Sequence, residues 1–139
     1  MKVLVINGSP KGDYSTTLQT VKYLEILFPG HCFEYINAGA QIRLFENDMT
    51  LALQALESAD LLIFSYPVYT FLVPSQLHRF IELIKTSGID LRGKFATQIT
   101  TSKHFYDTTA HAFICENCMD LGMKYIKGLS ADMDDLTME

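Results

Sequence analysis

Serine and threonine side chains cluster just after the first apolar segment of the chain. Residues 7–17 read Asn-Gly-Ser-Pro-Lys-Gly-Asp-Tyr-Ser-Thr-Thr, and the candidate phosphate ligands among them are Ser9, Lys11, Ser15, Thr16 and Thr17. Gly8 and Gly12 permit a close backbone approach, and the N–H groups at a helix start attract anions. Hydroxyl groups can bind a phosphate monoester with little help from fixed positive charge. The segment therefore predicts a phosphate-binding loop, with an ordinary capped β–α turn as the alternative.

Other phosphate-binding patterns are absent from the sequence. There is no G-x-x-x-x-G-K-[ST] segment, which argues against a P-loop NTPase, and no G-x-G-x-x-G dinucleotide fingerprint. The first apolar segment also ends without a pair of carboxylates, which argues against a response regulator. The loop must therefore be judged together with the rest of the chain.

A second unusual segment is rich in aromatic residues and poor in charge. Residues 65–76 contain three aromatic side chains and two prolines. A flat aromatic ligand could stack on Tyr69 or Phe71, and the prolines would stiffen the backbone around it. A satellite core or a subunit interface would explain the same residues. If this segment lies at the same sheet edge as a phosphate loop, an isoalloxazine ring is the better explanation.

The elements that must position these segments alternate between strand and helix. We expect strands at residues 2–7, 31–37, 60–66, 95–101 and 123–129. We expect helices at about 15–28, 45–58, 76–86 and 106–121, with Gly122 at the C′ position of the last one. Such alternation predicts a parallel sheet with right-handed crossovers. Ligands then bind beyond the carboxyl ends of the strands, where loops 8–14, 67–74 and 101–105 would meet.

Composition restricts the class of protein. The chain has 139 residues and a net charge of −5, which indicates one globular domain without the basic stripe of a nucleic-acid-binding protein. No run of 18 apolar residues predicts a membrane span. Three cysteines argue against a secreted disulfide framework, so we expect a cytoplasmic protein. We interpret the C-x-x-C at Cys115 and Cys118 as structural, because it falls late in a predicted helix.

Three short segments carry a resemblance to a known family. Residues 6–11, 66–69 and 73–77 resemble the NADPH-dependent FMN reductase branch of the flavodoxin-like flavoproteins, without the cysteine cluster of the iron–sulfur flavoproteins. The resemblance implies a doubly wound α/β fold with five parallel strands in the order 2-1-3-4-5. It also implies FMN as cofactor and NAD(P)H as electron donor. Carried over residue by residue, it assigns the phosphate to Ser9, Lys11, Ser15, Thr16 and Thr17, and the ring to Pro67, Val68, Tyr69, Thr70 and Phe71, with Thr101, Ser102 and Lys103 near the ring's other edge.

The sequence departs from the family pattern in two places. Ser15 stands where the family usually has asparagine. After the fifth predicted strand only residues 130–139 remain, and these cannot supply the last helix of a five-stranded doubly wound domain. Two interpretations stay open: a partner chain supplies that helix, or the single domain of residues 1–139 is part of a longer protein.

The predicted function is an FMN-binding oxidoreductase. It would pass reducing equivalents from NAD(P)H through FMN to a quinone, a free flavin or another acceptor. The alternatives are an electron-transfer carrier without its own NAD(P)H site, and a non-enzymatic interaction module with this fold. We assign no catalytic acid–base residue and no metal ligand. We expect a homo-oligomer, because an uncovered sheet face or flavin loop would be buried against a second copy.

Overall fold

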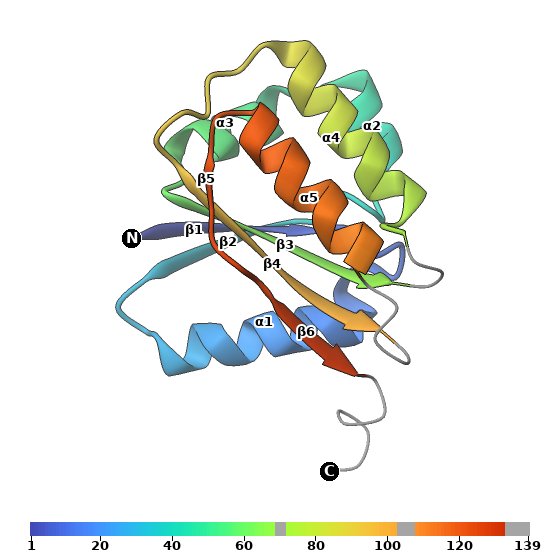
Figure 1. Ribbon diagram of the computed structural model, residues 1–139. Helices are drawn as coiled ribbons and strands as arrows, with labels where there is room; N and C mark the ends of the chain where they lie inside the picture. Colours follow the sequence, from blue (N-terminus) through green and yellow to red (C-terminus); the bar gives the residue numbers. More distant parts are fainter. Residues whose placement is uncertain (69–71, 103–107, 133–139) are drawn as a thin grey trace.

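A parallel sheet forms the centre of the molecule (Figure 1). The computed structural model describes residues 1–68, 72–102 and 108–132. The strands are β1 (Lys2–Asn7), β2 (Cys32–Ile36), β3 (Leu61–Val68), β4 (Phe95–Ser102), β5 (Lys124–Tyr125) and β6 (Leu129–Asp132). Their order is β2-β1-β3-β4-β5, with β6 also pairing with β4, and every pairing is parallel. The expected strand order and fold class are confirmed, because β5 and β6 together fill the fifth position.

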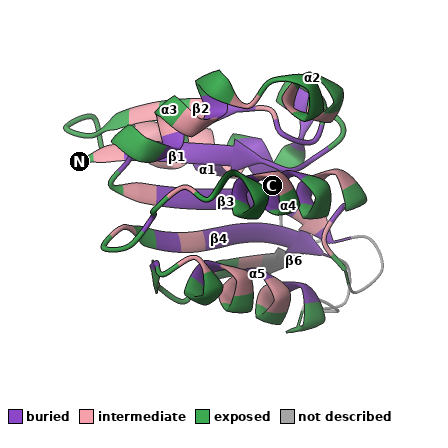
Figure 2. Ribbon diagram, turned by 90° about the horizontal axis from the view of Figure 1, so that it is seen from above, coloured by how far each residue is buried: buried purple, intermediate pink, exposed green. Residues whose placement is uncertain are grey.

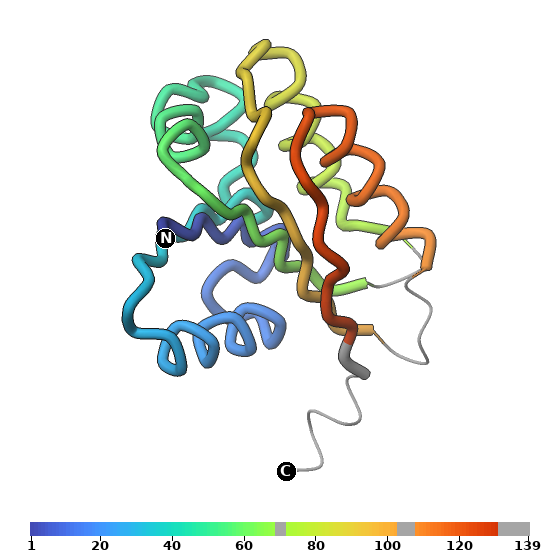
Figure 3. The backbone as a smooth tube through the Cα atoms, turned by 60° about the vertical axis from the view of Figure 1, so that its left-hand side comes forward, coloured from blue at the N-terminus to red at the C-terminus, as the bar shows by residue number. Residues whose placement is uncertain are grey.

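Helices lie on both faces of this sheet (Figures 1 and 3). They are η1 (Gly12–Tyr14, a 3₁₀ turn), α1 (Thr16–Leu27), α2 (Ile42–Asn47), α3 (Thr50–Ser58), α4 (Ser75–Ser87) and α5 (Thr108–Asp120). Of the α-helices in the described part of the chain, α1 lies on one face, whereas α3, α4 and α5 cover the other. None of the described helices is both long and apolar enough to cross a lipid bilayer.

Two of the predicted elements are broken by local features. The single helix predicted over 45–58 is wrong, because the chain forms α2 and α3 with a break at Asp48. The Asp48 carboxylate accepts bonds from the N–H and the hydroxyl of Thr50 (2.9 and 2.6 Å), which favours a new helix start there. The strand predicted over 123–129 is also interrupted. The backbone of Gly128 approaches β4 so closely that a Cβ atom would lie 2.1 Å from the Gln98 carbonyl oxygen.

Other strand and helix boundaries lie closer to those predicted from the sequence. The strand predicted to end at residue 66 continues to Val68, so Pro67 and Val68 belong to β3 instead of to a loop. Gly122 follows α5 with a φ of 82°, as a C′ glycine does.

Burial differs between the two faces of the sheet. Figure 2 shows buried strands at the centre and helices with exposed outer sides. The larger core lies on the side of α3, α4 and α5, where Phe64, Phe80 and Ile114 pack together. A smaller core lies under α1 and includes Val5, Val21 and Ile63. The α1 side is therefore the less covered of the two.

Candidate functional site

The carboxyl ends of β1, β3 and β4 meet at one edge of the sheet (Figure 1). Asn7 of β1 lies opposite Ser65 of β3, and Val68 lies opposite Ser102 of β4. The Gly8 N–H donates to the Ser65 carbonyl (2.8 Å), which ties the start of the first loop to β3. The topology thus brings the predicted phosphate loop beside the ends of the two strands that lead to the other predicted segments.

The Asn7 side chain fixes the conformation of the first loop through hydrogen bonds to its backbone. Its side chain is fully buried. The carboxamide oxygen accepts the Ser9 N–H (3.1 Å), and the Nδ2 atom donates to the Gly12 carbonyl (2.9 Å) and to the Asn37 Oδ1 atom (3.1 Å). One side chain therefore satisfies backbone groups at both ends of the turn, as Asn does in tight loops. The loop has a defined form before any ligand binds.

The loop after β2 supports the phosphate loop from the side. The Gly39 N–H donates to the Asn7 carbonyl (3.0 Å), and the Asn37 side chain donates to the Asp13 carboxylate (3.4 Å). A Cβ atom at Gly39 would lie 2.4 Å from the Gly8 oxygen and 2.5 Å from the Ser9 oxygen. Only glycine leaves room for the two backbones to touch in this way.

The predicted phosphate ligands lie together around the start of α1. Ser9 is buried, and its Oγ atom accepts the Lys11 N–H (3.2 Å). Ser15 is the N-cap of α1 and accepts the Leu18 N–H (3.4 Å). A hydroxyl group that accepts a backbone bond keeps its own hydrogen for another acceptor. Both serines therefore retain a donor for an anion.

The remaining members of this set differ in exposure. The side chains of Lys11 and Thr16 are exposed at the loop surface. Thr17 is buried against β4, where its hydroxyl group lies 2.7 Å from that of Thr101. One of these two hydroxyl groups donates its hydrogen to the other, so the second hydroxyl hydrogen is left for a different acceptor. In the first turn of α1, the N–H groups of Thr16 and Thr17 have no acceptor within the described part of the chain, as expected of N-terminal helix donors.

Two buried hydroxyl groups at this edge have no partner among the described residues. They are the Oγ atoms of Ser65 and Ser102, whose residues are 0% and 2% exposed. Their positions in the strands place them on opposite faces: Ser65 on the α1 side with Thr101, and Ser102 on the other side with Val68. A buried unpaired hydroxyl group is costly unless a ligand completes its bonding. The donor set fits FMN, whose phosphate and ring both need hydrogen-bond partners.

The residues predicted to surround the ring are only partly within the described residues. Pro67 is half-buried and Val68 is buried at the end of β3. Tyr69, Thr70, Phe71 and Lys103, together with His104, lie outside the described residues. The structure therefore places the phosphate half of the predicted site and the strand ends that lead to the ring half.

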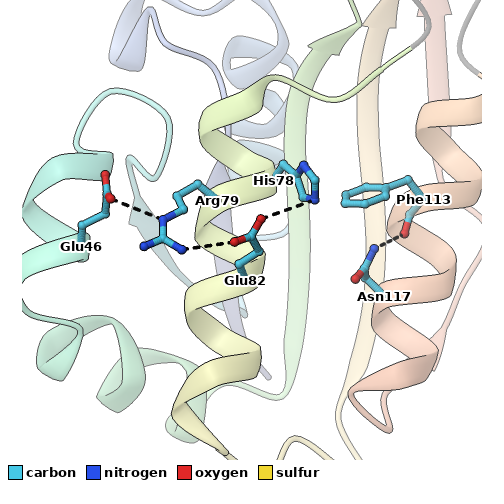
Figure 4. Close-up of polar contacts among 6 residues, drawn as sticks. All are labelled: Glu46, His78, Arg79, Glu82, Phe113 and Asn117. Atoms are coloured by element: carbon cyan, nitrogen blue, oxygen red, sulfur yellow. Dashed lines mark hydrogen bonds and ion pairs between the residues drawn. The ribbon is translucent and has the colours of Figure 1, made fainter.

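His78 of α4 and His111 of α5 both contact residues of neighbouring elements. On the outer surface, His78 lies 3.8 Å from Glu82 and packs edge-on against Phe113, while Arg79 pairs with Glu46 and Glu82 (Figure 4). These ion pairs are exposed; the pair between Arg79 and Glu46 joins α4 to α2, and the other two lie within α4. His111 joins α5 to β4: its Nε2 atom lies 2.7 Å from the Thr100 hydroxyl oxygen, and its carbonyl accepts from Gln98.

The C-x-x-C segment is not a reactive dithiol. Cys118 is buried, and this burial raises the pKa of its thiol from 9.0 to about 12. The nearby Cys115 makes a smaller contribution in the same direction. Cys115 is half-exposed, with its Sγ atom 3.9 Å from the Met119 sulfur. No group of three or more potential metal ligands occurs among the described residues. The interpretation of these cysteines as structural agrees with this environment.

We expect Cys118 to resist alkylation in the folded protein. Its raised pKa lowers the thiolate fraction at neutral pH by roughly a thousandfold relative to an ordinary thiol. Iodoacetamide at pH 8 should therefore label the exposed Cys32 and leave Cys118 unlabelled until the chain is unfolded. Peptide mass mapping measures both sites. Labelling of Cys118 at the rate of Cys32 in folded protein would contradict this environment.

The same shift has a consequence at alkaline pH. The folded state keeps the Cys118 proton up to about pH 12, whereas the unfolded chain loses it above pH 9.0. The unfolded state is therefore favoured progressively between these values. Urea unfolding should show a stability that falls across this range, with a smaller fall in a Cys118→Ala variant.

The sequence matches a known protein family. A family model described as Flavodoxin-like fold matches residues 1–128. The chain belongs to this family. None of the curated proteins compared matches the sequence.

Solved structures share this flavodoxin-like fold at low sequence identity. An FMN-dependent NADH-azoreductase from Bacillus anthracis str. Ames Ancestor, in complex with FMN, is 18% identical with a TM-score of 0.76, covering 100% of this chain and 90% of that one. An apo NADH:FMN oxidoreductase is 20% identical with a TM-score of 0.80, covering 99% and 80%. A mutant flavodoxin from Pseudomonas aeruginosa is 14% identical with a TM-score of 0.64, covering 97% and 86%.

Three residues that contact or adjoin the first loop, Ser65, Asn7 and Gly39, were not among the predicted site residues. Ser65 was part of the aromatic segment but was not chosen; it lies within β3, opposite Asn7 at the end of β1. Asn7 and Gly39 were not chosen either. An asparagine that ends a buried strand just before Gly-Ser is a usable signal, because it can satisfy loop N–H groups. No sequence signal indicated that Gly39 touches the first loop.

Proposed function

We propose that this protein is an FMN-dependent oxidoreductase that takes reducing equivalents from NAD(P)H and delivers them to a quinone, a free flavin or another acceptor. The observation that carries the proposal is the pair of buried hydroxyl groups of Ser65 and Ser102, which have no partner among the residues that the structure describes and lie at the sheet edge that also carries the first loop. The azoreductase of the same fold is FMN-dependent and uses NADH, and the oxidoreductase of the same fold is an NADH:FMN enzyme, which supports the proposal.

Different residues of the chain would bind the phosphate and the ring of FMN. Ser9, Ser15 and Thr16, with the N–H groups that begin α1, would bind the phosphate. Ser65 would donate its hydroxyl hydrogen on the α1 side of the sheet. Lys11 would add one exposed positive charge, which the neighbouring Asp13 partly offsets.

The ring half would be held by the ends of β3 and β4. We propose that Pro67, Val68, Tyr69, Thr70 and Phe71 surround the ring, and that Thr101, Ser102 and Lys103 lie along its other edge. The flavin, when bound, supplies the hydride and electron chemistry, while the protein orients it and tunes its electronics. The free thiols of Cys32, Cys115 and Cys118 suit a reducing, cytoplasmic setting.

A Ser65→Ala variant tests the proposal through two opposed effects. Removing an unpaired buried hydroxyl group should leave the FMN-free protein as stable or up to about 1 kcal/mol more stable. The same change should raise the Kd for FMN by about tenfold, because a charge-assisted bond to the ligand is lost. Flavin-fluorescence quenching measures binding, and urea unfolding without FMN measures stability.

The exposed Ser58 of α3 supplies the matched control for this experiment. A Ser58→Ala variant should leave the Kd for FMN unchanged, because its hydroxyl group bonds only to the Ala55 carbonyl. Loss of apo stability in Ser65→Ala without weaker FMN binding would contradict the assignment. Absence of FMN binding by the folded wild-type chain would overturn the proposed function itself.

A carrier role is the second candidate, since a flavodoxin shares the fold. A carrier would bind FMN as tightly but would not consume NAD(P)H on its own. NADH and NADPH oxidation by the FMN-loaded protein, with a quinone as acceptor, separates the two. A folded chain that binds no FMN would favour an interaction module instead.

A further inference from the structure

Strand β2 forms one edge of the sheet, and in the described part of the chain only β1 pairs with it. Figure 2 shows β2 on the side of the sheet away from β6. The Cys32 N–H donates to the Met1 carbonyl (3.1 Å), toward β1. In a parallel ladder every second residue bonds to the same neighbour, so the N–H and C=O groups of Phe33 and Tyr35 point away from β1. Such a row of backbone groups is a template for a further strand.

A groove lies beside this edge, on the side of the sheet that carries α3. It has a volume of about 720 Å³, which is a size typical of ligand sites. Strand β2, α2 and α3 all contribute to its lining, which includes Glu34, Ile36, Phe45, Leu51, Ala52 and Ala55. We call this hollow the β2 groove. Because α3 presents alanines to it, there is room for the side chains of another segment.

The β2 groove has an apolar floor and exposed apolar walls. Ile36 and Ala52 are 9% and 1% exposed, so the core closes the floor. Leu44 and Leu51 also line the groove, and they are 62% and 78% exposed. Large apolar side chains exposed around a hollow with a polar rim mark an interaction site. An extended segment fits here, because its alternate side chains point to the same side.

The charges of the β2 groove favour a basic occupant. The Glu34 carboxylate forms no ion pair with any described residue, and the residue opposite it on β1 is Leu4. Asp48 adds a second carboxylate, whose pKa is lowered by hydrogen bonds from Thr50. Lys2 is the single cation in the lining that the structure describes. A basic side chain directly opposite Glu34 on an added strand would therefore find an unpaired partner.

We propose that the β2 groove binds an extended segment of a partner protein as an added strand on β2. A basic side chain of that segment lies opposite Glu34, and large apolar side chains two residues before and after it enter the groove. Main-chain bonds to Phe33 and Tyr35 supply affinity, while the alternate side chains supply specificity.

The added strand lies next to the candidate site without covering it. One end of the β2 groove is lined by Asn37 and Gln41, and the Asn37 side chain also bonds to Asn7 and Asp13 of the first loop. Strand β1 separates β2 from β3 and β4, whose carboxyl ends therefore stay open. Binding at the β2 groove does not require FMN.

The probe is the pentapeptide acetyl-Leu-Val-Arg-Val-Leu-amide, titrated into the FMN-free native chain. Its side-chain pattern is the same in both directions, so it serves a parallel or an antiparallel added strand. Amide hydrogen exchange, followed by NMR, reports on the edge. In the free chain the N–H groups of Phe33 and Tyr35 should exchange faster than those of Glu34 and Ile36. Saturating peptide should slow the exchange of the first pair by about tenfold or more.

A charge swap tests the pairing at Glu34. Glu34→Lys should raise the Kd of the arginine peptide by about tenfold, because like charges then lie opposite one another. The same variant should prefer acetyl-Leu-Val-Glu-Val-Leu-amide. Glu34 is exposed, so circular dichroism should show a folded variant. Glu116→Lys is the matched control, since Glu116 is exposed on α5, which packs against β4 and β5, and both Kd values should stay unchanged.

Four results would overturn the proposal. One is an arginine peptide that does not bind at millimolar concentration. Another is a peptide that binds without slowing the exchange of the Phe33 and Tyr35 amides, or that binds as tightly when its arginine and both valines are N-methylated. The third is a peptide preference that Glu34→Lys does not reverse. The last is protection of these amides that rises with protein concentration in the absence of peptide, which would assign the edge to a second copy.

Discussion

A Gly39→Ala variant should lose about 2–3 kcal/mol of stability and most of its affinity for FMN. The added methyl group would lie 2.4 Å from the Gly8 oxygen and 2.5 Å from the Ser9 oxygen, and both are backbone atoms that cannot rotate away. The loop after β2 must therefore move off the phosphate loop, which costs what overpacking of a tight contact usually costs. We expect the Kd for FMN to rise at least tenfold, because Ser9 moves with the loop. Urea unfolding and fluorescence quenching measure the two effects.

Gly30→Ala is the matched control for this substitution. Gly30 follows the end of α1, has no atom within 4 Å of its would-be Cβ position, and has no positive φ. Its replacement should change neither stability nor binding by more than a few tenths of a kcal/mol, since it touches nothing. Equal effects of the two alanine variants would show that the contact between Gly39 and the first loop is not what matters.

An Asn7→Asp variant should be destabilised by about 3–5 kcal/mol at neutral pH, the cost of an unpaired buried charge. The new carboxylate would face the Gly12 carbonyl and the Asn37 Oδ1 atom, which now accept bonds from the Asn7 Nδ2 atom. The defect should be smaller at pH 4 than at pH 8, because a protonated carboxyl group is neutral and can donate one bond. Thermal unfolding at both pH values measures this dependence.

Asn47→Asp provides the isosteric control, since Asn47 is exposed at the end of α2. It introduces the same charge change without burying it, so stability should hardly change. For FMN binding, Asn7→Asp should be deleterious beyond its effect on stability, because it places negative charge beneath the loop proposed to hold the phosphate. Wild-type affinity in the folded variant would remove Asn7 from any role in shaping that loop.

The sequence predicted the sheet well because its strands carry strong local signals. Continuous apolar runs such as Leu62 to Phe64 are typical of a central strand that is buried on both faces. Because these strands alternate with helices, the sequence also predicts that they run parallel. The break at Asp48 was missed because an apolar helical pattern runs across it, and only the bond from Asp48 to Thr50 marks the new start. The interruption near Gly128 depends on a contact with Gln98, which local sequence does not reveal.

The sequence predicted those residues of the candidate site whose side-chain type alone indicates their chemistry. Ser9 and Ser15 are recognisable because hydroxyl groups gather in one glycine-containing turn. The roles of Ser65 and Gly39 depend on their surroundings in the fold: a buried hydroxyl group without a partner among the described residues in one case, and a backbone contact with the first loop in the other. Such roles follow from distances between segments, and a single sequence does not record those distances.

The hydrogen bonds that shape the candidate site differ greatly in the sequence separation of the residues they join. Asn7 bonds across 5 residues to Gly12 and across 30 to Asn37, whereas Thr17 meets Thr101 across 84. Loop-closure entropy makes the short contacts cheaper to form. We therefore expect the first loop to take shape early in folding, with β1 and β2, and the contact between Thr17 and Thr101 of β4 to form last. A nascent chain would then have the turn proposed to bind the anion in place before β3 and β4 have docked.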